Sequence, residues 1–306
     1  MPLLHDHDTP GLQRVQMISY LSYTLPSLLG SAFVLLVIVS LKLYSKALNR
    51  IVFFISLGDF LLSLPLEFFV EATETTCMIV ASIHYYGIIS SLYWTSLFAV
   101  VFVHISKSSA QLILQKYFKW FLGVGLLLPL PWIAFLGLTR YYDTIIGNFC
   151  YHSGTTTFEY QVLVVSVIPP LIAIAVNAVC YVTVFFRLRN VLQGSSHQNQ
   201  GVNLLALFVF PLILIVCWTP HIVTYVLYEL HIDVNDNIQI PLGFLNRLQG
   251  ILNALFYGLS PVVRQSLRQG VRELCSRRST NTKERLLFDQ STMRQSAISS
   301  GTISDY

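Results

Sequence analysis

Seven segments of the chain are apolar over a length that can cross a lipid bilayer, and this feature restricts the fold more than any motif does. A spanning helix needs about 20 mostly apolar residues. Of the 306 residues only 11% are charged, against about 25% in soluble domains. The predicted spans are Met17–Tyr44, Leu48–Val70, Cys77–His104, Tyr117–Leu138, Phe158–Phe186, Leu204–Leu230 and Ile238–Leu259. We therefore expect an all-α membrane protein built as a seven-transmembrane helix bundle.

The positions of the basic residues predict the orientation of this bundle. Lys and Arg in short loops favour the cytoplasmic side of a membrane. All of the 19 Lys and Arg residues except Arg14, Arg140 and Arg247 lie in the loops and the tail on one side. We therefore expect a multi-pass protein of the cell membrane with an extracellular N-terminus (residues 1–16), a transmembrane domain (residues 17–260) and a cytoplasmic C-terminus.

The segment after the last span divides into two parts. Residues 261–275 begin with Pro261 and place apolar side chains on one helical stripe and Arg side chains on another, which is typical of a short amphipathic eighth helix on an anionic membrane surface. Cys275 at its end is a candidate for palmitoylation, with a free cytosolic thiol as the alternative. Residues 276–306 are rich in Ser and Thr, and we expect a disordered tail.

Two of the five cysteines fall on the predicted outer side. Cys77 begins the third span and Cys150 lies in the loop after the fourth, on the oxidising face where disulfides persist. A Cys77–Cys150 disulfide is expected to hold that loop over the mouth of the bundle, and two free thiols are the alternative. Cys180 and Cys217 lie within spans.

Polar and ionisable side chains lie inside several predicted spans, where they usually face the bundle interior and mark functional sites. Asp59 in the second span is a carboxylate that must be paired, hydrated or protonated. The third span carries a polar and aromatic wall that includes His84, Tyr85 and Trp94. These residues are candidates for function rather than for lipid contact.

Prolines occur within two spans. Pro169 and Pro170 are expected to interrupt the hydrogen-bond ladder of the fifth span, and Pro220 should kink the sixth span just after Trp218. A kink of this kind gives a helix a point about which it can move.

The last span carries polar and small residues at helical spacing. Residues three and four apart lie on one helix face, and here they are Asn246, Gln249, Gly250, Asn253 and Tyr257. We assign Gln249 and Gly250 to helix packing. For Asn253, and for Asn177 in the fifth span, packing and a switch role both stay open. Arg247 needs an anion at this depth, and the candidates are Asp59, Glu67 or a ligand group.

Taken together, these residues resemble a G-protein-coupled receptor. Cys217-Trp218-Thr219-Pro220 is similar to the CWxP kink, Asn253 to Tyr257 resembles NPxxY with Ala in place of Pro, and Ser56 to Asp59 resembles the Leu-X-X-Asp region of the second span. Arg247-Leu248-Gln249-Gly250, with Trp94-Thr95 and Phe149-Cys150-Tyr151, resembles the cyclic-AMP-receptor-like group of slime moulds, fungi and other protists. The third span ends VFVHISKSS and lacks a DRY or ERW triplet.

The resemblance implies signalling from an extracellular ligand to a heterotrimeric G protein, with an arrestin-like protein and a kinase as further partners at the tail. We expect ligand contact from His84, Tyr85, Trp94 and Arg247, and switch roles for Asp59, Trp218, Pro220, Asn253 and Tyr257. An anionic cyclic nucleotide suits Arg247, whereas the acidic outer surface repels anions at long range. Membrane lipids are expected partners, and neither a cofactor, a metal nor nucleic acid is expected.

Three other classes compete with this reading. A small-molecule transporter or channel is the main alternative, although no internal repeat relates spans one to three with spans five to seven. A retinal protein needs a Lys within a span, and the six Lys residues lie in loops, span edges or the tail. An enzyme is not expected, because no HExxH, GxSxG or clustered metal-ligand pattern occurs.

Overall fold

The computed structural model describes part of the chain and divides it into two units. The described residues are 10–45, 47–66, 73–105, 110–138, 144–146, 149–151, 164, 167–194, 209–229, 232, 238, 241–242, 245–259, 263–265 and 268. The units are Met1–Gly258 and Leu259–Tyr306. The helices and strands below lie in the first unit, and the last helix ends at its boundary.

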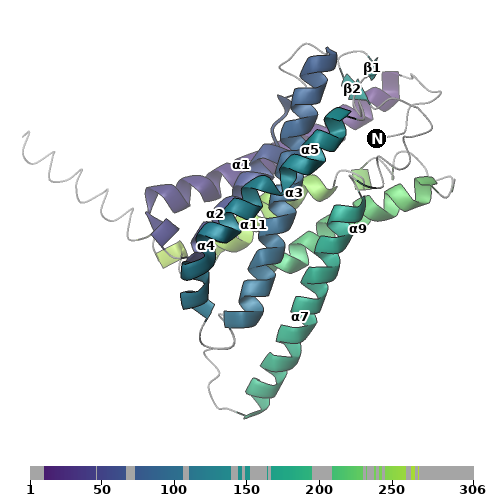
Figure 1. Cartoon of the computed structure of the whole chain (residues 1–306). Helices are drawn as coiled ribbons and strands as arrows, with labels where there is room; N and C mark the ends of the chain where they lie inside the picture. The colour runs from purple at the N-terminus through teal and green to yellow at the C-terminus, as the bar shows by residue number, and fades with distance from the viewer. Residues whose placement is uncertain are drawn as a thin grey trace, which may run out of the picture. The chain divides into compact units, whose positions relative to one another are not determined.

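Helices dominate the described part of the chain (Figure 1). Four stretches are long and apolar enough to cross a membrane, Ile18–Ser40, Thr75–His104, Gln115–Leu138 and Ile168–Phe186, and Leu212–Leu227 is apolar but shorter. The predicted helical membrane character is thereby confirmed. The elements are α1 (Pro10–Ser40), η1 (Leu43–Ser45), α2 (Ala47–Leu62), α3 (Glu74–Ile105), α4 (Ala110–Leu127), α5 (Pro129–Leu138), β1 (Thr144–Ile146), β2 (Phe149–Tyr151), α7 (Ile168–Gly194), α9 (Val209–Glu229), η4 (Leu245–Leu248) and α11 (Gln249–Leu259).

Prolines explain two departures from the predicted spans. Helix α2 ends at Leu62, well before the expected Val70, since Pro65 follows and disfavours helical backbone in the residue before it. The predicted fourth span is two helices, α4 and α5, separated at Leu128, because Pro129 has no N–H to continue the ladder. In each case averaged hydropathy gives one apolar segment and does not detect where the helix ends.

Proline also marks the start of two helices. Helix α1 begins at Pro10, earlier than the predicted Met17, and proline is favoured at the first helical position. Helix α7 begins at Ile168, so Pro169 and Pro170 lie in its first turn. Val164 and Val167, just before this turn, are π-helical. The proline pair therefore lies where the hydrogen-bond pattern changes from π-helical to α-helical.

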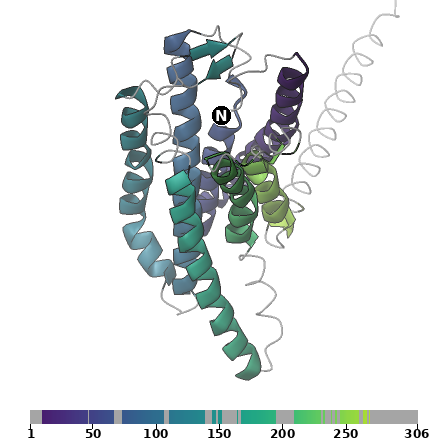
Figure 2. The same cartoon turned by 90° about the vertical axis from the view of Figure 1, so that its right-hand side faces the viewer.

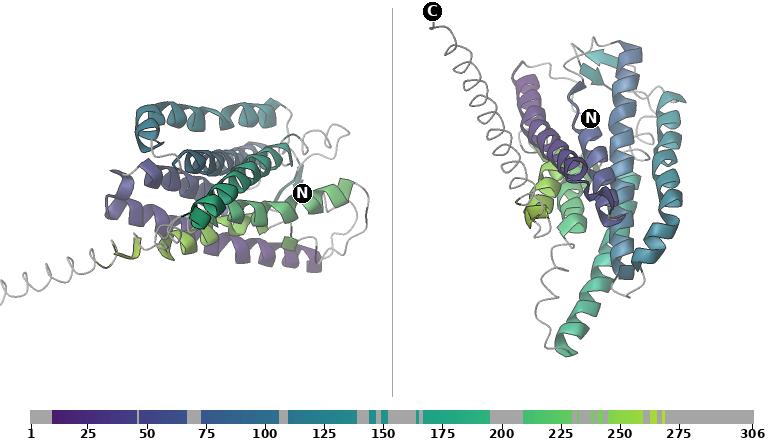
Figure 3. Two further views of the ribbon diagram at one scale, coloured as in Figure 1. Left: turned by 90° about the horizontal axis from the view of Figure 1, so that it is seen from below. Right: turned by 90° about the vertical axis from the view of Figure 1, so that its left-hand side faces the viewer.

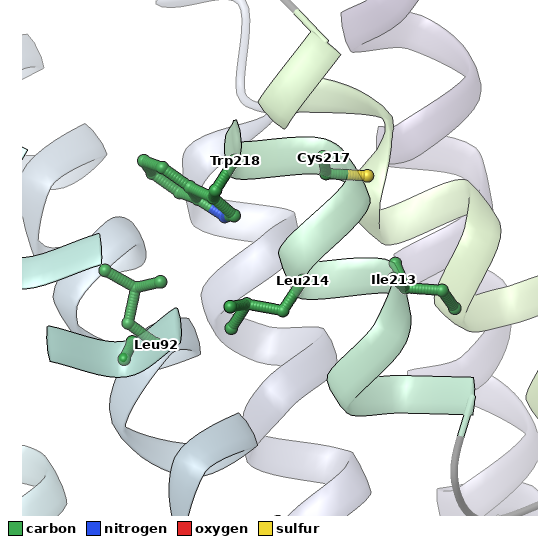
Figure 4. Packing of buried hydrophobic residues seen from close by; sticks show 6 residues of the cluster. Leu92, Ile213, Leu214, Cys217 and Trp218 are labelled. Carbon is green, nitrogen blue, oxygen red and sulfur yellow. The ribbon is translucent and has the colours of Figure 1, made fainter. Parts of the chain in front are cut away.

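Helix α3 is the element around which the others pack. It contacts α2, α4, α5, α7 and α9, while α1 packs against α2 and η4 (Figure 3). One apolar cluster joins α3, α7 and α9, and in it Leu214 and Trp218 of α9 point toward Leu92 of α3 (Figure 4). This packing sets the position of Trp218, which matters for the site below.

Two glycines allow α2 and α3 to approach backbone to backbone. A Cβ atom at Gly87 would lie 2.6 Å from the amide nitrogen of Leu62 and 2.8 Å from the carbonyl oxygen of Gly58. A Cβ atom at Gly58 would lie 2.8 Å from the amide nitrogen of Ser91. The close approach brings Asp59, next to Gly58, within reach of the side chain of Ser91.

A short hairpin lies beside the N-terminal end of α3 (Figure 1 and Figure 2). Strands β1 and β2 pair antiparallel, with Ile145 opposite Cys150. The all-α expectation did not include this hairpin. Cys77, at the start of α3, is buried and in a disulfide, whereas Cys180 and Cys217 are free. The side chain of Cys150 lies outside the described residues, so the Cys77–Cys150 pairing stays a prediction.

In the second unit the structure describes Leu259, which ends α11, and residues 263–265 and 268. Residues 263–265 and 268 are helical, and they fall within the predicted amphipathic helix. The rest of residues 261–275, including Cys275, and the predicted disordered tail at 276–306 lie outside the described residues.

The approach of α2 to α3 gives a stability prediction. Gly87→Ala should lower the thermal unfolding midpoint of the detergent-solubilised protein, since overpacking of this kind costs about 1–3 kcal/mol. Gly123→Ala is the matched control, because a Cβ atom there meets no atom within 4 Å. Equal midpoints for the two variants would show that the helices separate at no cost.

Candidate functional site

The carboxylate of Asp59 is the centre of a buried hydrogen-bond network. Its side chain is 1% exposed. Oxygen Oδ1 accepts from Ser91 Oγ at 2.6 Å and from Gln249 Nε2 at 3.2 Å, and Oδ2 accepts from Asn253 Nδ2 at 2.7 Å. Burying a carboxylate is costly unless its oxygens are hydrogen-bonded. Donors from α3 and α11 meet that requirement for a residue of α2.

Gln249 connects this carboxylate to a fourth helix. Its Nε2 also donates to Ser91 Oγ at 2.9 Å, and its Oε1 accepts from Trp218 Nε1 at 2.7 Å. The donor and the acceptor of one amide are therefore both used. The bonds of Gln249 run between helices, in keeping with the packing role predicted for it, and they reach α2, α3 and α9. We call the set Asp59, Ser91, Trp218, Gln249 and Asn253 the Asp59 network.

Glycine lets α11 come close enough to form the network. A Cβ atom at Gly250 would contact the hydroxyl oxygen of Ser27, and it would lie 2.9 Å from the carbonyl oxygen of Ser27 and 3.3 Å from Cβ of Asp59. On the facing helix, a Cβ atom at Gly30 would lie 2.8 Å from Cα of Ile251. Helices α1, α2 and α11 thus meet with little side chain between them, as the small-residue prediction for Gly250 requires.

Arg247 binds the end of a helix rather than a carboxylate among the described residues. Its Nη1 donates to the carbonyl oxygen of Leu62 at 2.6 Å, and its Cζ lies 4.9 Å from the ring centroid of Tyr20. Leu62 is the last residue of α2, where carbonyl groups lack helical partners and the helix dipole favours a cation. Of the partners considered from sequence, Asp59 bonds to the donors named above, and Glu67 lies outside the described residues.

His84 contacts the same helix end. Its Nε2 lies 2.7 Å from the carbonyl oxygen of Leu64, two residues beyond the one that Arg247 binds. Two of the four predicted ligand-binding residues are therefore brought together by the C-terminal turn of α2. That they contact a ligand stays a prediction.

The other two predicted ligand-binding residues lie elsewhere on α3. Tyr85 is buried in an apolar cluster with Leu136, Val167 and Tyr225. Trp94 is fully buried and stacks on Phe54, with ring centroids 4.6 Å apart. It is ten residues beyond His84, or about 15 Å along a helix. Its contacts explain Trp94 as a packing residue of α2, α3 and α4, and its contact with a ligand stays an untested prediction.

Of the predicted switch residues, Asp59, Trp218 and Asn253 belong to the network, and Tyr257 and Pro220 lie next to it along α11 and α9. Tyr257 lies one turn after Asn253 on α11 and is 6% exposed. Its hydroxyl and Asn253 Oδ1 are buried and have no hydrogen-bond partner within the described residues. Pro220 lies two residues after Trp218 inside α9, where it removes one backbone hydrogen bond. A change in α9 at this point acts directly on the Trp218–Gln249 bond.

Asn177 serves helix packing in this structure. Its Nδ2 donates to Ser96 Oγ at 3.0 Å and to the carbonyl oxygen of Ala173 at 2.7 Å. It therefore ties α7 to α3 and lies outside the Asp59 network.

Helix α1 contributes a polar face that was not predicted from the sequence. Tyr20, Thr24, Ser27 and Ser31 follow one another at intervals of three or four residues, which places them on one helix face. That spacing is the signal that predicts a polar seam facing α2 and α11. Averaged hydropathy conceals it, because the opposite face of α1 is strongly apolar.

Neither a metal site among the described residues nor a matched protein indicates a function. Among the described residues no group of three or more His, Cys, Asp or Glu side chains gathers to hold a metal ion. Comparison of the sequence with models of known protein families and with curated proteins finds no match. Function is therefore inferred from the arrangement of these residues.

The network predicts unequal effects for two serines of one helix. Ser91→Ala should reduce the free energy of unfolding by about 1–3 kcal/mol, because it leaves a buried carboxylate oxygen and Gln249 short of a partner. Ser82→Ala is the control, since Ser82 Oγ donates to the carbonyl oxygen of Met78 in its own helix. Thermal unfolding of the two variants measures the difference. Equal losses would refute a special role for Ser91.

Proposed function

We propose that this chain is a receptor of the cell membrane, with seven spans, an outer N-terminus and an inner C-terminus, that passes a signal from an extracellular ligand to a heterotrimeric G protein. The observation that carries the proposal is the Asp59 network, which joins α2, α3, α9 and α11 through buried side chains. Its role is signalling rather than catalysis. The resemblance to the cyclic-AMP-receptor-like group is part of this proposal.

A network of this kind supports two alternative helix arrangements. Ionisable groups within a membrane are costly and usually functional. Each bond of the network holds for one relative position of the helices, and packed interiors change between discrete arrangements rather than deform continuously. Trp218 belongs to both the network and the α3–α9 apolar cluster. Movement of α9 about Pro220 therefore alters both at once.

The residues at the end of α2 support a ligand site near the outer side. A guanidinium has five N–H donors, and the bond of Arg247 to Leu62 uses one of them. The remaining donors suit an acidic ligand group. His84 lies against the same helix end and Tyr85 follows it on α3. An acidic ligand here would act on Arg247, which binds Leu62, and Leu62 lies three residues after Asp59 in α2.

The proposal is tested by expressing the chain with a panel of chimaeric Gα subunits. Small anions, lipids and peptides are screened, and ligand-dependent nucleotide exchange on Gα is measured. Parallel measurements of solute flux in liposomes test the main alternative, a small-molecule transporter or channel. Solute flux without nucleotide exchange would identify a transporter or channel and overturn the proposal.

Asp59→Asn should change activation far more than surface expression. An amide cannot accept hydrogen bonds at both positions where Asp59 oxygens accept them. Losing one bond to a charged group costs about 1.5–3 kcal/mol, or roughly a 10–100-fold shift between receptor states. Asp8→Asn, in the segment before α1, is the control. A loss of expression without altered signalling of the expressed protein would assign Asp59 to folding alone.

Arg247→Ala should abolish the response to an acidic ligand. Arg50→Ala is a close control, since Arg50 also donates to a carbonyl oxygen, that of Tyr44, and lies over an aromatic ring, that of Phe118. Ligand potency is measured for both variants. Unchanged potency for Arg247→Ala would make Arg247 a structural cap of α2.

A further inference from the structure

Three buried polar side chains form a layer between Arg247 and Asp59. Thr24 of α1 is 0% exposed, Ser63 after the end of α2 is 1% exposed, and Asn246 of η4 is 6% exposed. Thr24 Oγ1, Ser63 Oγ and Asn246 Oδ1 have no hydrogen-bond partner within the described part of the protein. We call these three residues the polar layer.

Helical spacing places the layer one turn from a known contact. Gly250 lies against Ser27 of α1 and Asp59 of α2. Thr24 is three residues from Ser27, Ser63 is four from Asp59, and Asn246 is four from Gly250. Thr24 and Ser63 therefore each lie about one α-helical turn, roughly 5 Å, from a residue that Gly250 contacts, in the direction of Arg247. Asn246 directly precedes Arg247 in the 3-10 helix η4. The amide of Ser63 bonds to the carbonyl oxygen of Asp59, which shows that this turn is helical.

The contacts of Arg247 bound the layer on its other side. Tyr20, whose ring Arg247 covers, is four residues from Thr24, and Leu62, whose carbonyl oxygen it binds, directly precedes Ser63. Arg247 itself directly follows Asn246. The polar layer thus lies with a guanidinium on one side and a carboxylate on the other.

We propose that the polar layer is a binding site for ordered water, which links the Arg247 guanidinium to the Asp59 carboxylate. Buried polar atoms without partners are rare, and buried waters typically make two to four hydrogen bonds to such atoms. Hydroxyl groups donate and accept, whereas Asn246 Oδ1 only accepts, and water matches this mixture. A cation in the layer would meet the charge of Arg247, and an anion would meet that of Asp59.

A hydrated layer connects the two charged residues without direct contact. Water accepts hydrogen bonds from the guanidinium and the hydroxyl groups and donates toward Asn246 and Asp59. The water link between Arg247 and Asp59 is inferred from the polar layer and its neighbours, without reference to a ligand. Its use in signalling also rests on the proposed function, because an acidic ligand that draws on Arg247 would then disturb the hydrogen bonds of Asp59.

Removing a hydroxyl group from the polar layer tests whether the layer binds water, because the two cases change the thermal unfolding midpoint in opposite directions. If Ser63 and Thr24 bind water, Ser63→Ala and Thr24→Val leave that water short of a partner and should each lower the thermal unfolding midpoint by about 2–4 °C. If the hydroxyl groups bind nothing, the same substitutions remove an unpartnered polar atom, and the midpoint should stay or rise. The second result would overturn the proposal. Ser22→Ala is the control, an exposed serine of α1 that bonds the carbonyl oxygen of Ser19.

A double-mutant cycle tests the link itself. The unfolding midpoints of Asp59→Asn, Arg247→Gln and the double variant are compared in the wild type and in a Thr24→Val/Ser63→Ala background. Coupling between the two residues should appear in the wild type and vanish in the second background. Equal coupling in both would show that the charges interact without the layer and would overturn the link. Neither experiment uses a ligand or a G protein, so its failure is distinct from failure of the proposed function.

Discussion

The buried carboxylate of Asp59 must be solvated by the protein, because hydrocarbon offers it nothing. That requirement explains much of the described architecture. Gly58 and Gly87 bring α2 against α3 so that Ser91 reaches the carboxylate, and Gly250 brings α11 close enough for Asn253. Helix α9 enters through the bond of Trp218 to Gln249. Hydrogen bonds of one acidic group thus join three helices, and Gln249 joins a fourth to them.

The second organising contact lies at the C-terminal end of α2. The early end of that helix, ahead of Pro65, leaves carbonyl groups that Arg247 and His84 bind. A cation at this position both satisfies the helix end and keeps donors for other groups. The same α2 helix therefore carries the central anion and, one turn further on, the binding point for a cation. A displacement of Arg247 would therefore take place close to Asp59.

The sequence predicted helical character better than it predicted side-chain partners. Apolar length predicted helices, of which four described stretches are long enough to cross a membrane, whereas the seven-helix arrangement stays a prediction. Helical spacing placed Asn253 on the inward face of α11, because spacing depends only on the order of residues along one helix. The partner of Arg247 was not predictable, since it is a backbone carbonyl that any residue at position 62 would supply. For Gln249 an interhelical packing role was predicted, but its partner Trp218 was not, because Trp218 belongs to another helix. Local periodicity shows which face is polar but not what it meets.

The long sequence separation within the Asp59 network has a consequence for biosynthesis. Asn253, which donates to Asp59, is 194 residues further along the chain, and Gln249 is 190 residues further, whereas Ser91 follows after only 32. At about 5–20 residues per second, synthesis separates Asp59 from Asn253 by roughly 10–40 s. During that interval α2 carries its carboxylate while the donors of α11 are still unmade. A nascent or truncated chain without α11 would therefore hold an acidic residue without two of its hydrogen-bond donors, a mark that cellular quality control can recognise.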